Sequence, residues 1–189
     1  MKLILGTASK QRRDVFEKMG YKEFEVLAAD IDERVIRLED PKELTIALAK
    51  AKAKAIMQRI DEPAILITAD QVISWANTIR EKPQSREEAK EFLMSYHQVP
   101  AFIVNGVVVT NTESGKQAQG NDYTKVVFDK IPEDVAEEMV EELDVFTWAG
   151  GFAVKEPAFK PYIKNLEGLA GSSRGLPEKL TKELIAEVS

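Results

Sequence analysis

The sequence opens with Lys2-Leu-Ile-Leu-Gly-Thr-Ala-Ser-Lys-Gln-Arg-Arg-Asp14, in which an apolar run ends at Gly6 and cations follow soon after. This order predicts a buried strand, a tight turn and a helix that begins after Ser9. Backbone N–H groups in the first turn of a helix bind anions, and arginine can donate paired hydrogen bonds to phosphate. Two interpretations stay open: a phosphate cradle built from Ser9, Arg12 and Arg13, or a solvated basic turn.

The composition is typical of a soluble globular protein and excludes several kinds of site. The 189 residues are 44% hydrophobic and 31% charged, which is enough for a sizeable core. The formal net charge of −6 argues against nonspecific binding to a nucleic acid polymer. The chain has no cysteine and a single histidine, His97, so thiolate nucleophiles, zinc clusters and multi-histidine metal sites are excluded. No targeting segment or long apolar run is visible, and we expect a cytoplasmic protein without a membrane span.

Predicted strands and helices alternate along the chain, which favours an α/β architecture. The expected strands are 1–5, 24–28, 64–69, 71–75, 78–81, 101–110, 123–128 and 146–154. The expected helices are 10–19, 41–60, 85–96, 132–143 and 177–188. The polar segment 111–120 is expected to join two antiparallel strands, and residues 168–175 to form a loop. Since no linker or repeat is visible, a single domain over residues 1–189 is expected.

Charged residues at three further positions are candidates for chemistry. Glu33 ends the acidic string 29–33 after a predicted strand, which suits a Mg²⁺ ligand and also describes a polar turn. Lys52 interrupts an apolar row at four-residue spacing, so it either reaches the surface or extends toward an anion. Asp70 follows the apolar run 64–69, where ligands of α/β sheets collect, although a turn-capping aspartate fits as well.

Short motifs along the chain occur in the order and spacing of one known family. The motifs are Thr7-Ala-Ser9-Lys-Gln-Arg12-Arg13, Ala29 to Glu33, Leu48-Ala-Lys-Ala-Lys52-Ala53, Ala69-Asp-Gln-Val-Ile73, Glu81-Lys82-Pro83, Ala149-Gly-Gly-Phe152 and Gly175-Leu-Pro177. On these residues the chain resembles the Maf (septum-formation protein) family of nucleoside triphosphate pyrophosphatases over nearly its whole length. Any one motif is a weak signal, and their common order makes the resemblance specific.

The resemblance implies a fold and an activity. The implied fold is a mixed twisted α/β sheet with flanking helices, in two lobes around an elongated cleft, similar to the inosine triphosphate pyrophosphatases. The implied activity is hydrolysis of a nucleoside triphosphate to the monophosphate and pyrophosphate with a divalent metal, Mg²⁺ or Mn²⁺, often by a homodimer. The Asp70-Gln71 pair resembles the branch associated with 7-methyl-GTP and the pyrimidine triphosphates UTP, dTTP and CTP. Two alternatives stay open, an inosine or xanthosine triphosphate pyrophosphatase and a catalytically weak nucleotide-binding regulator of cell division.

The resemblance also implies roles for individual residues. The expected phosphate-binding residues are Ser9, Arg12 and Arg13. The expected catalytic residues are Asp70, Glu33, Lys52 and Lys82, of which Glu33 and Asp70 hold the metal. The expected substrate-binding residues are Gln71 and Lys155.

Several positions depart from the family's pattern. Gln11 stands where arginine is usual, and Glu81 replaces the glycine of a Gly-Lys-Pro signature. Ala101 replaces a histidine, and Asn105-Gly106 replaces Thr-Gly. Lys155 stands where glutamine or glutamate is common, which bears on the contact made there to nucleotide or metal. The departures at Ala101 and Lys155 are consistent with the regulator alternative.

Overall fold

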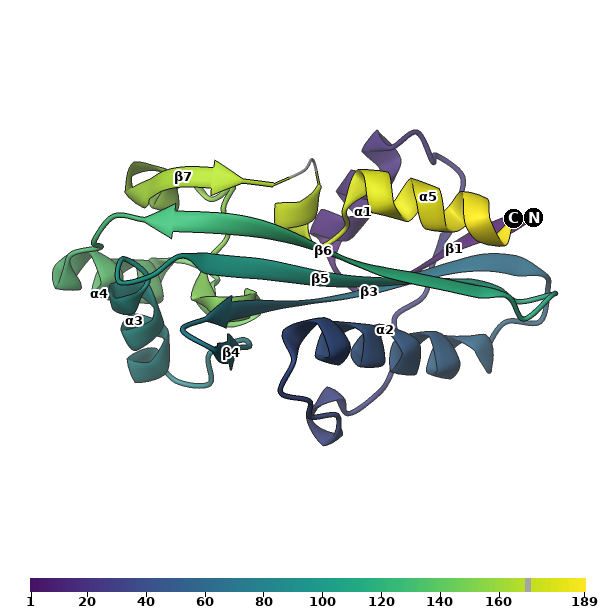
Figure 1. Cartoon of the computed structure of the whole chain (residues 1–189), viewed down its shortest axis with the longest axis horizontal. Helices are drawn as coiled ribbons and strands as arrows, with labels where there is room; N and C mark the ends of the chain where they lie inside the picture. Colours follow the sequence, from purple (N-terminus) through teal and green to yellow (C-terminus); the bar gives the residue numbers. More distant parts are fainter. Residues whose placement is uncertain (169–170) are drawn as a thin grey trace. The chain divides into compact units, whose positions relative to one another are not determined.

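A computed structural model of the protein describes residues 1–168 and 171–189. Its strands form one mixed sheet with the hydrogen-bonded order β2-β1-β3-β5-β6-β7, and β4 pairs with β3. The strands are β1 (Lys2–Gly6), β2 (Glu25–Val26), β3 (Ala64–Trp75), β4 (Thr78–Arg80), β5 (Ala101–Asn111), β6 (Gln117–Phe128) and β7 (Ile163–Glu167). The α-helices are α1 (Lys10–Lys18), α2 (Pro41–Met57), α3 (Arg86–Ser95), α4 (Glu133–Glu142) and α5 (Glu178–Val188) (Figure 1). Short 3₁₀ helices are η1 (Glu33–Val35), η2 (Val145–Thr147), η3 (Ala149–Gly151), η4 (Pro157–Tyr162) and η5 (Ser172–Arg174). The expected α/β class, a mixed sheet with flanking helices, is confirmed.

The chain divides into two compact units. The first consists of residues 1–71, 105–122 and, among the described residues, 171–189; the second consists of residues 72–104 and 123–168. Part of the expected loop 168–175, Leu169 and Ala170, lies outside the described residues. Within the described part of the chain, no helix is both long and apolar enough to span a bilayer.

Alternation along β3 sends its side chains to two faces of the sheet in the first unit. The face covered by α1 and α5 receives Ile65, Ile67 and Ala69. The face covered by α2 receives Ala64 and Leu66. Figure 1 shows α5 and α2 on opposite sides of these strands. Asp70 continues the series that faces α2, and Gln71 continues the series that faces α1 and α5.

The parallel pairing of β1 with β3 determines where the opening turn lies. Gly6 at the end of β1 pairs with Thr68 of β3. The chain therefore leaves β1 beside the part of β3 that carries Asp70. The surroundings of Gly6 leave no room for a side chain, because a Cβ at this position would lie 2.6 Å from Thr68 Cγ2 and 2.7 Å from Ile56 Cδ1.

Asp70 lies inside a strand, and the expectation that it follows a strand was wrong. The segments 64–69 and 71–75, expected as two strands, form the single strand β3. A charged side chain inside a buried strand is tolerated when it is paired, and Asp70 is paired. A hairpin turn joins β3 to β4, and its residues Ala76 and Asn77 have φ of 47° and 61°, as a two-residue type I′ turn requires.

The hairpin of β5 and β6 is longer than expected. The connection is 112–116 instead of 111–120, because the polar residues from Gln117 onward pair in the sheet. The turn is stabilised by Asn111, whose Oδ1 accepts hydrogen bonds from the backbone N–H groups of Glu113 and Ser114, each at 3.1 Å. The side-chain amide of Asn111 also donates to the carbonyl oxygen of Val188 at 2.9 Å.

A glycine in β5 allows the backbone of α2 to approach the sheet closely. A Cβ on Gly106 would lie 2.5 Å from the carbonyl carbon of Thr45 and 2.7 Å from the amide nitrogen of Ile46. These are backbone atoms of α2, so a side chain at Gly106 can be accommodated only by moving the helix.

We therefore expect Gly106→Ala to lower the free energy of unfolding by about 2 kcal/mol or more, as overpacking does in a close-packed interior. Urea unfolding would measure this. Gly115→Ala is the control, because Gly115 also resists substitution through its φ of +73° but has nothing within 4 Å of its Cβ position. If Gly106→Ala cost no more than Gly115→Ala, the close approach would carry no energetic weight.

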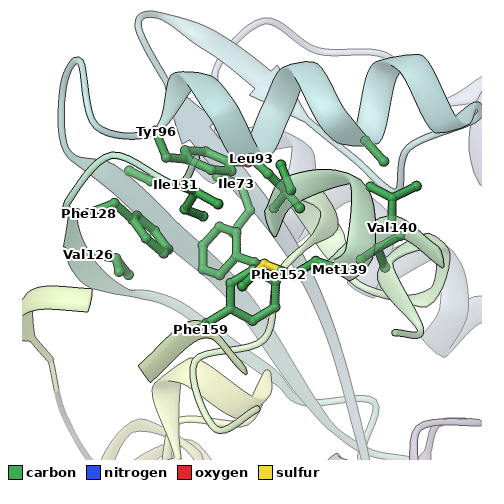
Figure 2. Close-up of a cluster of buried hydrophobic side chains, with 14 of the residues drawn as sticks. Ile73, Leu93, Tyr96, Val126, Phe128, Ile131, Met139, Val140, Phe152 and Phe159 are labelled. Carbon is green, nitrogen blue, oxygen red and sulfur yellow. The ribbon is translucent and has the colours of Figure 1, made fainter. Parts of the chain in front are cut away.

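The second unit is built around an aromatic core, shown in Figure 2. The ring of Tyr96 stacks on Phe128 at 5.4 Å and meets Phe152 edge-on at 5.1 Å. The expected strand 146–154 was wrong, since Gly150 and Gly151 adopt φ of +67° and +74°, which strands do not contain. The strand β7 was not predicted, because its sequence carries few apolar residues; it pairs with β6 in antiparallel orientation.

Candidate active site

Lys52 of α2 forms two ion pairs within the first unit. Its Nζ lies 2.5 Å from Oδ1 of Asp70 and 3.2 Å from Oε2 of Glu33. The side chains of Lys52 and Asp70 are 11% and 8% exposed, whereas that of Glu33 is 50% exposed. The ammonium group therefore points to the two carboxylates and does not extend to the surface. Removing one partner of such a buried pair leaves the other charge uncompensated.

The surroundings of Asp70 act on its charge in opposite directions. Burial raises the pKa of the Asp70 carboxyl group, while the positive charges of Lys52 and Arg12 favour its ionised form. Burial also lowers the pKa of the Arg12 guanidinium, against the attraction of Asp70 and Glu33. Two cations and two acids thus interact electrostatically in one place, with donors suited to phosphate oxygens and oxygens suited to a hard cation.

Two backbone carbonyl groups hold the guanidinium of Arg12. Its Nη1 donates a hydrogen bond to the Ala69 oxygen at 2.8 Å, and its Nε donates to the Gly175 oxygen at 3.0 Å. The planar guanidinium thereby connects β3, one residue before Asp70, with the turn after η5. A lysine ammonium, which is a single point of charge, cannot reproduce this geometry.

Ser9 caps α1, as the sequence predicted. Its Oγ accepts a hydrogen bond from the backbone N–H of Arg12 at 3.4 Å, and its own N–H donates to Thr7 Oγ1 at 3.0 Å. The structure gives the first-turn N–H groups of Lys10 and Gln11 no acceptor among residues 1–168 and 171–189. Such N–H groups at a helix N-terminus are suited to an anion.

Gly175 is needed for the position of Arg12. Its φ is +82°, and a Cβ there would lie 2.9 Å from Arg12 Nε and 3.3 Å from Nη2. We expect Gly175→Ala to lower the free energy of unfolding by about 1–2 kcal/mol, because alanine disfavours the left-handed backbone conformation. The close contact of the new Cβ with the Arg12 guanidinium should add to this cost. Urea unfolding of Gly175→Ala in the wild-type and Arg12→Ala backgrounds would separate the two terms. The same cost in both backgrounds would show that the contact with Arg12 is unimportant.

The acidic string 29–33 contributes one carboxylate to this cluster. Asp32 caps η1, since its Oδ1 accepts hydrogen bonds from the backbone N–H of Arg34 at 3.1 Å and from its Nε at 3.0 Å. The cap begins the short helix at Glu33, whose side chain reaches Lys52.

The remaining predicted site residues are Arg13, Lys82, Lys155 and Gln71. Arg13 follows Arg12 on α1 and is exposed. Lys82 and Lys155 belong to the second unit, and both are exposed. Gln71 is half-buried in the first unit, where its Nε2 donates a hydrogen bond to Oδ1 of Asn105 at 3.1 Å.

Asn105 was not predicted as a site residue. It is fully buried in β5, and its Nδ2 donates to the carbonyl oxygen of Ser172 at 2.8 Å. The signal in the sequence was a polar residue inside the apolar run 101–110, since such a residue needs hydrogen-bond partners when it is buried.

Glu33 and Asp70 are the residues whose carboxylates could hold a magnesium ion. Mg²⁺ is typically bound by one or two carboxylates together with water and substrate phosphate oxygens, which is the kind of ligand set that these residues offer. In the described part of the chain no group of three or more His, Asp or Glu side chains converges, so the remaining ligands would be water and substrate.

Comparisons with known proteins agree with the motifs. A family model described as Maf-like protein matches residues 2–188. The chain is 41% identical to the 7-methyl-GTP pyrophosphatase of Dictyostelium discoideum, over 99% of this chain and 97% of that protein. It is 31% identical to the nucleoside triphosphate pyrophosphatase of Chlamydia muridarum, over 98% of this chain and 93% of that protein. A solved structure of a nucleoside-triphosphatase, or dITP/XTP pyrophosphatase, from Mycobacterium abscessus matches with a TM-score of 0.43 and 12% identity, over 99% of this chain and 96% of that one.

The structure is that of an α/β protein with a capped helix N-terminus and a cluster of acids, lysine and arginine at the sheet, and these are groups suited to anionic ligands. The family match, which spans nearly every residue, is decisive. The chain belongs to the Maf-like protein family.

Proposed function

We propose that this protein hydrolyses the bond between the α- and β-phosphates of a nucleoside 5′-triphosphate, with Mg²⁺ or Mn²⁺, to give the monophosphate and pyrophosphate. The observation that carries the proposal is the Lys52 ammonium between Asp70 and Glu33, with Arg12 acting on the same carboxylates. The names of the sequence relatives, which are nucleotide pyrophosphatases, support it.

The residues can meet the electrostatic demands of this reaction. Attack of water on the α-phosphorus builds negative charge on the nonbridging oxygens and on the departing pyrophosphate. The first-turn N–H groups of α1, Ser9 and Arg12 would bind phosphate oxygens, with Arg13 nearby. Lys52 and Lys82 would neutralise the triphosphate.

The acids would handle water and metal. Asp70 would orient the attacking water and accept its proton. Glu33 and Asp70 would hold the divalent cation, which when bound neutralises charge on phosphate oxygens. Gln71 and Lys155 would contact the rest of the nucleotide.

We propose 7-methyl-GTP as the preferred substrate. The Dictyostelium discoideum relative of that name is 41% identical over nearly the full length of both proteins, and the chain carries Asp70-Gln71. A relative from Clostridium beijerinckii, 28% identical over both full chains, is named dTTP/UTP pyrophosphatase, so UTP, dTTP and CTP are the next candidates. The homodimer and the cytoplasmic location remain predictions; light scattering of the purified protein would test the first.

A nucleotide panel tests the proposal. The purified protein is incubated with Mg²⁺ and, separately, 7-methyl-GTP, UTP, dTTP, CTP, GTP, ITP and XTP, and the monophosphate and pyrophosphate are quantified. We expect equal amounts of the two products, the highest kcat/KM for 7-methyl-GTP, and loss of turnover in EDTA that added Mg²⁺ restores. Preference for ITP or XTP would contradict the substrate assignment. Tight nucleotide binding without any product would contradict the catalytic proposal and favour a regulator.

A further inference from the structure

Two side-chain amides and one backbone carbonyl form a hydrogen-bonded cluster in the first unit. Gln71 Nε2 donates to Asn105 Oδ1 at 3.1 Å and to the carbonyl oxygen of Ser172 at 3.4 Å. Asn105 Nδ2 donates to the same Ser172 oxygen at 2.8 Å. The cluster joins β3, β5 and η5.

The Ser172 carbonyl oxygen determines the orientation of the side-chain amides of Gln71 and Asn105. A backbone carbonyl oxygen only accepts hydrogen bonds, so each side chain must direct its NH₂ group toward it. Asn105 then presents its Oδ1 to Gln71, which matches the hydrogen bond between them. Reversing either amide would place oxygen against oxygen and leave buried groups unpaired. Both N–H bonds of Gln71 are thereby used within the protein, and its Oε1, which accepts no hydrogen bond within the described part of the chain, is left to meet a ligand.

Asn105 is held more firmly than Gln71. It is fully buried, and its backbone oxygen accepts a hydrogen bond from Asn121 Nδ2 at 3.2 Å. Its neighbour Gly106 packs directly against the backbone of α2. Gln71 is only half-buried, so a ligand can reach it while Asn105 keeps its orientation.

The cluster adjoins the charged site. Gln71 follows Asp70 on β3 but faces the opposite side of the sheet, toward α1. Arg12, which comes from α1, binds the carbonyl oxygens of Ala69 and Gly175. Ser172 Oγ is also buried here and has no hydrogen-bond partner among the residues that the structure describes.

From these contacts we propose that Asn105 is a positioning residue that fixes the Gln71 amide, so that Gln71 Oε1 accepts a hydrogen bond from the nucleoside part of the substrate. This rests on the proposed function, because it assigns specificity within that nucleotide site. The partner is an N–H group of the base or a hydroxyl group of the ribose, which share the donor chemistry that a fixed acceptor recognises. A site built around such a bond discriminates strongly against analogues that lack the donor.

The test compares Gln71→Met, Asn105→Leu and the double variant, all close in size to the original side chains. For the best substrate of the nucleotide panel, each single variant is expected to raise KM by about tenfold, the effect of one lost hydrogen bond, while kcat stays within about twofold. The double variant should be no worse than Gln71→Met, because Asn105 acts through Gln71. Two substrate analogues, one with a 2′-deoxyribose and one whose base lacks an N–H donor, show which group Gln71 contacts. The analogue that lacks the true donor should have a raised KM with the wild-type protein, and Gln71→Met should not raise that KM further.

Asn111→Leu is the matched control. Asn111 is another buried asparagine on β5, and its side chain bonds the backbone at Val188 and in the β5–β6 turn. Its substitution should lower the melting temperature as much as Asn105→Leu does and leave KM at the wild-type value. Should Asn105→Leu fail to fold, Asn105→Ser takes its place with the same expectation.

The proposal is overturned if Asn105→Leu leaves KM unchanged, if its effect multiplies with that of Gln71→Met, or if Asn111→Leu raises KM equally. Wild-type protein that turns over no nucleotide would instead remove the proposed function. In that case calorimetric binding of an α,β-methylene nucleotide analogue to the same variants still decides whether Asn105 acts through Gln71.

Discussion

Asp70→Asn is expected to lower kcat/KM for the best nucleotide substrate by about 10²-fold or more, as the loss of a catalytic electrostatic group does. Asparagine keeps the shape of the side chain and removes the charge that meets Lys52 at 2.5 Å. It also removes the group proposed to orient water and bind the metal. Steady-state assays of pyrophosphate release with Mg²⁺ would measure the effect, and circular dichroism would confirm that the variant is folded.

Asp61→Asn is the control for this prediction, because Asp61 is an exposed acid in the same unit. It should retain wild-type turnover. If Asp70→Asn kept more than about a third of the wild-type kcat/KM, less than 1 kcal/mol of transition-state stabilisation would depend on the charge, and the assignment would be wrong.

Arg12→Lys should reduce both activity and stability, although it conserves the charge. Lysine lacks the two separate donor nitrogens, Nη1 and Nε, that bind the carbonyl oxygens of Ala69 and Gly175, and a buried carbonyl left unpaired costs about 1–3 kcal/mol. Loss of the planar donor group at the phosphate should lower kcat/KM by about 10²-fold. Urea unfolding and steady-state kinetics on the same preparation would measure the two effects.

Arg59→Lys is a matched control for Arg12→Lys. Arg59 is exposed, and its Nη1 donates to the backbone oxygen of Ala28 at 2.8 Å, so it makes a single bond of the same kind. Its substitution should change the free energy of unfolding by less than about 0.5 kcal/mol, as expected at the surface. If the two variants lost the same free energy of unfolding, the two hydrogen bonds of Arg12 to backbone carbonyl groups would have no special role.

Much of the fold follows from local signals in the sequence. Ser9 and Asp40 begin helices because their side chains accept hydrogen bonds from first-turn N–H groups. The apolar run 64–69 gave a buried strand. The segment 146–154 was wrongly predicted as a strand because most of its residues are apolar, whereas two of its glycines have positive φ. The strand β7 and the extra length of β6 depend on pairing with neighbouring strands, which the local sequence does not indicate.

The candidate site was only partly predictable. Lys52 and Asp70 stood out because charge interrupts an apolar pattern, and the structure pairs them. Their meeting depends on α2 covering one face of β3, which is a tertiary arrangement. The contacts of Arg12 with Gly175, 163 residues away, and of Asn105 with Ser172 are long-range. Arg80 shows the limit of local reasoning: it is a charged residue at the end of a hairpin, yet it is buried against the rings of Trp75, Phe92 and Tyr96.

Hydrolysis of 7-methyl-GTP in water enriched in ¹⁸O tests the proposed reaction most directly, with phosphorus NMR of the products. Attack on the α-phosphorus predicts 7-methyl-GMP that carries the label and pyrophosphate that does not. Label in the pyrophosphate, or release of orthophosphate with 7-methyl-GDP, would contradict the proposed reaction. The same experiment with Asp70→Asn should give at least a hundredfold slower formation of the labelled monophosphate, as expected when a charge-stabilising group is lost.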